Sequence, residues 1–286
     1  KAIEIPIPTP PKIKLVEDMS FLSIYEKDIN NSDSVATAIA KMASENKFTA
    51  KLTYRGNEHE ADKVFYDFQT KLIAFVTTYP EYFGIYSDAI IESKTSDEYN
   101  WNIVMTASPI VNLTEEQSIN KKEILFSNSK KILEQLINED KITIDMTDKE
   151  KAYVISKWVI ENNYYDRDIN TSSHYGADAF VDGTLVCDGY TSLINTMLRY
   201  LGIECYAMTG ITDGENHSWS IANLDGEWLI IDGSYMDPVV LDKDGSRHHE
   251  FNEDYFAISF NQLMKLNPNR TFSYNNLEAL NIKVDF

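Results

Sequence analysis

The feature that most constrains this chain is an apolar repeat that begins directly after Cys187. Apolar residues recur at the spacing of one face of an α-helix, and Gly202 follows them as a stop signal. The repeat consists of Tyr190, Leu193, Ile194, Met197, Leu198 and Leu201. It predicts a buried helix with Cys187 at or just before its N-terminus. There the helix dipole and the unpaired N–H groups favour the thiolate, so we expect Cys187 to be a reactive nucleophile.

A β-hairpin is predicted downstream of this helix. Residues 217–224 alternate as a strand does, Asp225-Gly226 is a strong two-residue turn signal, and residues 227–234 return. A turn of two residues sets the register, because residues at equal distance from the turn then face each other.

This register brings a histidine and an aspartate together. Trp219 faces Asp232, which makes His217 and Asp232 diagonal neighbours on one face of the sheet. Cα atoms at such positions lie roughly 7 to 8 Å apart, a gap that the two side chains can close. Local geometry therefore predicts a His–Asp pair, and only the approach of Cys187 is left to the tertiary fold.

The motifs around these residues resemble the core of the transglutaminase-like superfamily, most densely from about Thr147 to Pro238. They are Val186-Cys187-Asp188-Gly189-Tyr190, Gly202-Ile203, Gly210, His217-Ser218-Trp219-Ser220, Gly226-Glu227-Trp228, Asp232 and Asp237-Pro238. Upstream, residues 158–166, His174-Tyr175-Gly176-Ala177 and Tyr79-Pro80-Glu81-Tyr82 look like segments of secreted or surface bacterial members. The resemblance implies an α+β protein with a papain-like core, in which the helix bearing the cysteine packs on an antiparallel sheet.

The resemblance also implies a catalytic triad of Cys187, His217 and Asp232. Cys187 would attack a peptide or protein amide, His217 would move the proton and Asp232 would orient the imidazole. The implied reaction is acyl transfer through a thioester, as a protease or amidase or as a cross-linking enzyme. It needs no metal and no organic cofactor. Three aromatic residues are weaker candidates for contacts to the oxyanion or the substrate: Tyr175, Tyr190 and Trp219.

A second class of function stays open. The chain departs from the common family pattern around the site, at Leu185, at Ser218 and Ser220, and at Ser234-Tyr235. Several relatives keep the fold as binding modules. The alternative is therefore a catalytically silent module that holds a peptide or a cell-wall polymer in the same groove, and thiol reactivity distinguishes the two.

Charge and hydropathy narrow the partners and the location. The net charge of −19 argues against nucleic acid or an anionic membrane surface as partner, and favours a neutral or basic protein or peptide. No apolar run reaches the roughly 18 residues of a membrane span, so we expect no membrane insertion. The start without Met and the proline-rich residues 5–11 suit an exported protein at the cell surface or outside the cell, although a cloning boundary would look the same.

We predict three parts: a proline-rich linker over residues 1–14, an accessory α+β domain over 15–110, and the transglutaminase-like core over 111–286. In the accessory domain, helices are expected over residues 35–42 and 64–79, and strands over 51–54, 89–93 and 101–107. Capping boxes at Thr114 and Thr147 open two further helices. Residues 255–258 are expected to form a final strand that closes the sheet.

Two further features have simpler interpretations than chemistry. Cys205 lies in an apolar stretch and is expected to be a core strand residue. His248-His249 with Asp242 and Asp244 suggests a metal site only weakly, because adjacent histidines of a strand point to opposite sides.

Overall fold

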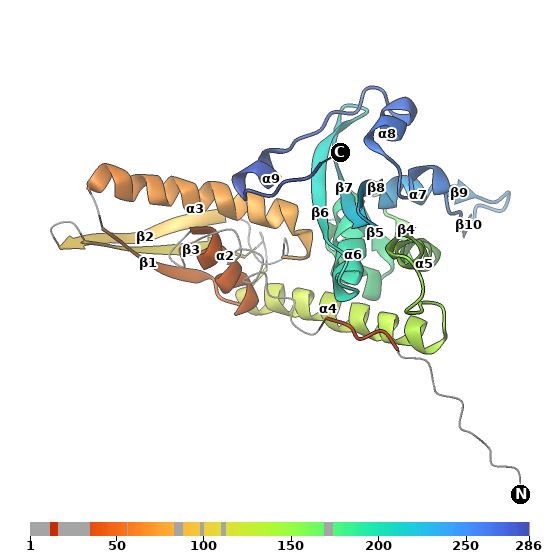
Figure 1. Ribbon diagram of the computed structural model, residues 1–286, viewed down its shortest axis with the longest axis horizontal. Coiled ribbons are helices and arrows are strands. Elements are labelled where there is room, and N and C mark those ends of the chain that lie inside the picture. Colours follow the sequence, from red (N-terminus) through yellow and green to blue (C-terminus); the bar gives the residue numbers. More distant parts are fainter. Residues whose placement is uncertain are drawn as a thin grey trace, which may run out of the picture.

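The computed structural model describes residues 12–16, 35–55, 57–82, 88–97, 100–109, 113–168 and 174–285. Most of the predicted proline-rich linker, residues 1–11, lies outside the described residues. Figure 1 shows two regions along the longest axis: a small sheet with helix α3 at one end, and the elements around helix α6 at the other.

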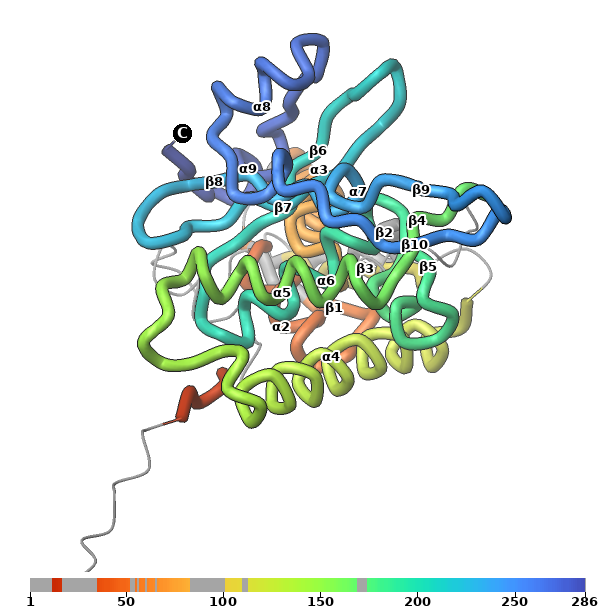
Figure 2. The backbone as a smooth tube through the Cα atoms, turned by 90° about the vertical axis from the view of Figure 1, so that its right-hand side faces the viewer, coloured from red at the N-terminus to blue at the C-terminus, as the bar shows by residue number. Residues whose placement is uncertain are grey.

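The core consists of one helix packed on an antiparallel sheet. Helix α6 (Cys187–Tyr200) contacts the strands of a sheet with the order β6-β7-β8, formed by β6 (Cys205–Thr212), β7 (Glu215–Leu224) and β8 (Glu227–Ile231). The α+β class and the expected packing of this helix on the sheet are confirmed. Helix α6 lies between the sheet and helix α4 (Glu115–Asn138) in both views (Figures 1 and 2).

The helices of the core begin where their sequence signals predict. Helix α4 follows Thr114 and helix α5 (Asp148–Asn162) follows Thr147, and each threonine forms a full capping box with the residue three positions later. Helix α6 carries the apolar repeat. Five of the six residues of the repeat are buried, and the sixth, the C-cap Leu201, is half-buried. Between α5 and α6 lie the short parallel strands β4 (Tyr164–Tyr165) and β5 (Thr184–Leu185) and the 3₁₀ helix η3 (Gly176–Phe180).

The N-terminal region has the predicted helices and strands. Helix α2 (Val35–Ser44) and helix α3 (Glu58–Thr78) accompany a sheet of order β1-β3-β2, and the 3₁₀ helix η1 (Pro80–Tyr82) follows α3. The strands are β1 (Thr49–Arg55), β2 (Asp88–Asp97) and β3 (Asn100–Ser108), all antiparallel to their neighbours. These elements do not test the predicted domain boundaries, which stay a prediction.

Several contacts join this region to the core, and two of them illustrate how. Helix α9 (Asn275–Ala279), close to the end of the chain, packs on α3 (Figure 1). In addition, Arg199 at the end of α6 forms a buried ion pair with Glu81 of η1 and donates a hydrogen bond to the carbonyl of Cys205. Breaking one partner of such a pair leaves an uncompensated buried charge, so this contact ties the two regions firmly.

The segment after β8 differs from the expected final strand. It forms helix α7 (Gly233–Met236), strands β9 (Val240–Leu241) and β10 (Arg247–His248), the 3₁₀ helix η4 (Glu253–Tyr255) and helix α8 (Phe260–Leu266). Of residues 255–258, only Ile258 pairs with the sheet, through an isolated bridge to Ile230. The strand is interrupted because η4 takes up Tyr255 and because Ala257 has a left-handed backbone (φ 49°), a conformation outside the β region. Among the described residues, no helix has the length and apolar character of a membrane span.

Candidate active site

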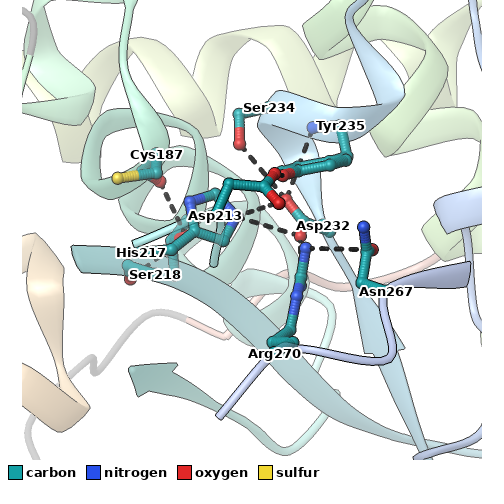
Figure 3. A network of polar contacts seen from close by, with 10 residues as sticks. Cys187, Asp213, His217, Ser218, Asp232, Ser234, Tyr235, Asn267 and Arg270 are labelled. Atoms are coloured by element: carbon teal, nitrogen blue, oxygen red, sulfur yellow. Dashed lines mark hydrogen bonds and ion pairs between the residues drawn. The ribbon is translucent and has the colours of Figure 1, made fainter. Parts of the chain in front are cut away.

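Cys187 is the first residue of α6, as the apolar repeat predicts. Its thiol is partly exposed, and the backbone N–H groups of Ser218 and Asp188 lie within hydrogen-bonding reach of the sulfur. Ser218 directly follows His217 on β7, so the helix and the hairpin meet at this sulfur (Figure 3).

The prediction that the helix N-terminus favours the thiolate of Cys187 is wrong, because the pKa of this thiol is raised. Burial raises the pKa of Cys187 to about 12, the neighbouring carboxylate of Asp188 also raises it, and the backbone N–H groups of Ser218 and Asp188 lower it. Desolvation disfavours the charged thiolate, and it is the largest cause of the raised pKa. Cys187 is therefore a neutral thiol at neutral pH and needs a base to become a nucleophile.

His217 and Asp232 meet as the hairpin register predicts. Leu224 pairs with Glu227 and Ser220 with Ile231, which is the register of a two-residue turn. The His217 Nε2 atom lies 3.0 Å from Asp232 Oδ2 and 3.1 Å from Oδ1. Because an ionised carboxylate only accepts hydrogen bonds, Nε2 carries the proton, and Nδ1 of a neutral imidazole is left as an acceptor. Figure 3 shows this second nitrogen on the side of Cys187.

Asp232 is fully buried and has four hydrogen-bonding partners. Besides His217 it accepts from the Ser234 hydroxyl (3.2 Å), from the Tyr235 N–H (3.4 Å) and from Arg270 Nη1 (2.6 Å). Burial alone would raise the pKa of Asp232, but His217 and Arg270 hold it below its usual range. No motif in the sequence signals Arg270, because it lies 38 residues beyond its partner.

Close packing at a glycine brings Asp232 to the helix of Cys187. A Cβ atom added to Gly233 would lie 2.6 Å from the Cβ of Tyr190 and 3.1 Å from Ile194 Cδ1, both on α6. Backbone and helix approach more closely here than any side chain would permit. The glycine after the aspartate thus sets the distance between the His–Asp pair and the thiol.

The three weaker aromatic candidates lie behind or beside the site. Tyr190 is fully buried and its hydroxyl donates to Asp237. Trp219 is also fully buried, with its ring 5.8 Å from the His217 ring. Tyr175 is buried beneath the ammonium group of Lys121, 4.9 Å from the ring centre. Contacts of these residues to an oxyanion or a substrate stay predictions.

A second histidine contacts Asp188, the residue that follows Cys187. His174 Nδ1 lies 3.0 Å from Asp188 Oδ2, and both side chains are about one-third exposed. The hydrogen bond to Asp188 raises the pKa of His174. When His174 is protonated, its charge offsets that of Asp188, the residue adjacent to Cys187. The sequence analysis gave His174 no role beyond the approach to the site.

The weak metal hypothesis has no support in the described part of the chain. His248 is hydrogen-bonded to Asp242 (3.1 Å), whereas the ring of His249 stacks on Tyr164 (4.1 Å between ring centres). The two histidines thus have different neighbours, and among the described residues no group of three or more His, Cys, Asp or Glu side chains is arranged to hold a metal ion.

By its chemistry, the site contains a thiol, an imidazole and a carboxylate. The thiol, the free Nδ1 and the buried carboxylate follow one another in the order needed for nucleophilic attack assisted by a general base. The structure therefore brings together the three residues predicted from the sequence, and adds Arg270.

Comparisons with known proteins match part of the chain to one superfamily. Residues 137–233 match the sequence profile of the transglutaminase-like superfamily. The chain is 25% identical over 183 residues to the human (Homo sapiens) kyphoscoliosis peptidase, covering 57% of this chain and 27% of that protein. It is 23% identical over 128 residues to the mouse (Mus musculus) kyphoscoliosis peptidase, covering 38% and 19%. The chain thus spans about a quarter of the length of these relatives.

Among solved structures, the chain is similar to one described as a TGase. The sequence identity is 12% and the TM-score is 0.33, with 73% of this chain and 56% of that chain covered.

Proposed function

Residues 137–233 belong to the transglutaminase-like superfamily, and from this premise we propose that the protein is a cysteine-dependent enzyme that transfers acyl groups of peptide or protein amides through a thioester at Cys187. The observation that carries the proposal is the hydrogen bond from His217 Nε2 to the buried carboxylate of Asp232. It leaves Nδ1 as the proton acceptor beside the thiol.

The proposed first step forms the thioester. Sγ of Cys187 attacks the amide carbonyl carbon while Nδ1 of His217 takes the thiol proton, because the raised pKa of Cys187 keeps the thiol neutral until then. The negative charge on the carbonyl oxygen is stabilised by the backbone N–H of Cys187 at the start of α6. Collapse of the tetrahedral intermediate breaks the C–N bond, and the imidazolium of His217 returns the proton to the leaving amine.

The second step resolves the thioester. Water or an amine attacks the carbonyl, His217 takes a proton from the attacking group, and the thiolate leaves and is protonated again. Attack by water completes a hydrolysis, and attack by a lysine amine completes a cross-link. The acidic chain, with a net charge of −19, attracts cationic groups and so suits a basic peptide or an amine acceptor.

The partners and the location follow as further proposals. A protein or peptide is the proposed substrate, and the proposed location is the cell surface or the outside of the cell. Nucleic acid is not proposed as a partner, because its phosphates would be repelled by the net charge.

One observation favours a second function. A cysteine whose pKa is raised to about 12 by burial is a poor nucleophile on its own. A silent module that binds a peptide or a cell-wall polymer has no need of a reactive thiol. It is therefore the alternative, and it makes the opposite prediction for turnover.

The deciding experiment uses two labelled substrates and two variants. Purified protein is incubated with a peptide library, and separately with a glutamine-containing protein and a labelled primary amine. Cleavage or amine incorporation that is lost in Cys187→Ala and kept in Cys205→Ala supports the enzyme. Cys205 is the matched control because it is the other cysteine of the chain and is buried in β6. Absence of both reactions in the parent protein, with retained peptide binding, supports the silent module.

A further inference from the structure

An arginine from the far end of the chain lies beneath the His217–Asp232 pair. Arg270 is paired with Asp232 at 2.6 Å, and both side chains are 0% exposed (Figure 3). Its guanidinium lies 5.0 Å from the ring centre of Trp219 and 4.9 Å from that of Tyr235. Arg270 lies outside residues 137–233, the part that matches the superfamily. The buried cation therefore comes from a part of the chain that the superfamily profile does not cover.

The segment that carries Arg270 is fastened to the edge of the sheet. Thr271 donates its N–H to the carbonyl of Ile211 (2.9 Å), and Ser273 donates to Thr209 (2.8 Å), both on β6. Between them, a Cβ atom on Gly210 would lie 1.9 Å from the carbonyl oxygen of Thr271. The contact depends on the glycine, and it holds Arg270 in one place relative to the hairpin.

Charge and geometry define what Arg270 can do there. A guanidinium stays protonated at every relevant pH, and its planar shape suits a position between two aromatic rings. Asp232 Oδ2 accepts hydrogen bonds from both Arg270 Nη1 and His217 Nε2. The negative charge of one carboxylate is thus shared between a permanent cation and an imidazole that can gain a proton. A nearby cation opposes protonation of the imidazole, whereas the carboxylate favours it.

We propose that Arg270 is a positioning residue that keeps Asp232 ionised and aimed at His217, and that limits how strongly this carboxylate stabilises a charged imidazole. The inference rests on the proposed role of His217 as general base. Arg270 touches neither the substrate nor Cys187 in this scheme, and acts only through Asp232.

The test follows the charge state of His217 in a protein that lacks the nucleophile. In Cys187→Ala, histidine labelled with ¹⁵N gives imidazole signals for five residues, which NMR follows as a function of pH. Two neutral variants are compared in this background: Arg270→Gln keeps an N–H donor, and Arg270→Met fills the space between the rings. Arg270→Lys keeps the charge. Arg199→Met is the matched control, because it removes another buried arginine with an acidic partner at the other end of α6.

The expected result is a shift that follows charge. In the neutral variants, the imidazole of His217 remains doubly protonated to a pH about one unit or more higher than in the parent, the lower end of the effect of a close charge. Arg270→Lys and Arg199→Met titrate like the parent, although Arg199→Met melts at a lower temperature. The inference is overturned if His217 titrates at the same pH in a folded neutral variant as in the parent. It is also overturned if Arg199→Met shifts the titration of His217 by the same amount as the neutral variants.

This readout is independent of turnover. If the titration shifts as expected but the Cys187 protein neither cleaves peptides nor incorporates amines, the proposed enzyme fails and the role of Arg270 in the His–Asp pair stands. If turnover is found without the titration shift, the enzyme stands and Arg270 is only structural.

Discussion

Gly233 and Tyr190 are in closer contact than two side chains could be: a Cβ atom on Gly233 would lie 2.6 Å from the Cβ of Tyr190. Gly233 directly follows Asp232, and Tyr190 is one turn along α6 from Cys187. The separation of nucleophile and orienting acid is therefore set by backbone packing rather than by the reacting side chains themselves.

Adding one methyl group at Gly233 should increase the distance between Cys187 and Asp232. Gly233→Ala overpacks this contact, and we expect a loss of about 1 to 3 kcal/mol in the free energy of unfolding. Chemical denaturation measures that loss. We also expect slower reaction of Cys187 with iodoacetamide, because α6 is displaced from His217. Unchanged stability together with an unchanged rate of alkylation would show that the contact can relax without cost.

The two cysteines should differ in reactivity because they differ in exposure. Burial raises the pKa of Cys205 to about 11, and that side chain is 2% exposed, whereas Cys187 is partly exposed. We expect iodoacetamide to label Cys187 first in the folded protein, with peptide mapping by mass spectrometry as the measurement. The rate at Cys187 should still rise above neutral pH, because its own pKa is raised to about 12 and the thiolate fraction grows up to that pH. A rate that is already maximal at mildly acidic pH would contradict the neutral thiol.

Asp188 should lower the reactivity of the Cys187 thiol. Its carboxylate is the second cause, after burial, of the raised pKa of Cys187. Asp188→Asn removes this negative charge, so the pKa of Cys187 should fall and alkylation at neutral pH should be a few times faster, in keeping with the effect of one partly screened charge. Asp242→Asn is the control, since this aspartate is exposed and hydrogen-bonded to His248. An equal acceleration in both variants would point to a general change of surface charge.

Loss of the Asp232 charge should affect both turnover and stability. Asp232→Asn removes the partner that orients His217, and we expect turnover to fall by about 10²- to 10⁴-fold. It also leaves Arg270 buried without its anion, so we expect a loss of about 3 to 5 kcal/mol, which thermal unfolding detects. Asp237→Asn is a useful comparison, because Asp237 is also buried but accepts from Tyr190. Retained turnover in Asp232→Asn would exclude Asp232 as the orienting acid.

The lowered pKa of Asp232 leads us to expect that the stability of the protein depends on pH. The pKa of Asp232 is held below its unfolded value, so its contribution to stability is present above that unfolded value and is lost as the pH falls through the folded pKa. The unfolded value is about 3.9. We therefore expect Asp232→Asn to abolish part of the acid-induced loss of stability below about pH 4, measured by denaturation at a series of pH values. Identical acid curves for the parent and the variant would contradict this assignment.

The sequence by itself determined the elements and the order of the site. The helical repeat placed Cys187 at the start of α6, and the Asp225-Gly226 turn set a register in which His217 and Asp232 meet. Both are local effects, because helix periodicity and a two-residue turn constrain residues close to one another in the chain. The expected strand over residues 255–258 failed, because a 3₁₀ turn and the left-handed Ala257 interrupt it.

Only the tertiary structure decided the electrostatics of the site. The pKa of Cys187 depends on how deeply the folded chain buries the thiol, and in this protein burial reverses the effect expected of a helix N-terminus. Arg270 reaches Asp232 because segment 270–273 pairs with β6, a contact between residues about 60 positions apart that no local pattern encodes. Periodicity and turns act over a few residues, whereas desolvation and ion pairing depend on everything that the fold brings to one point.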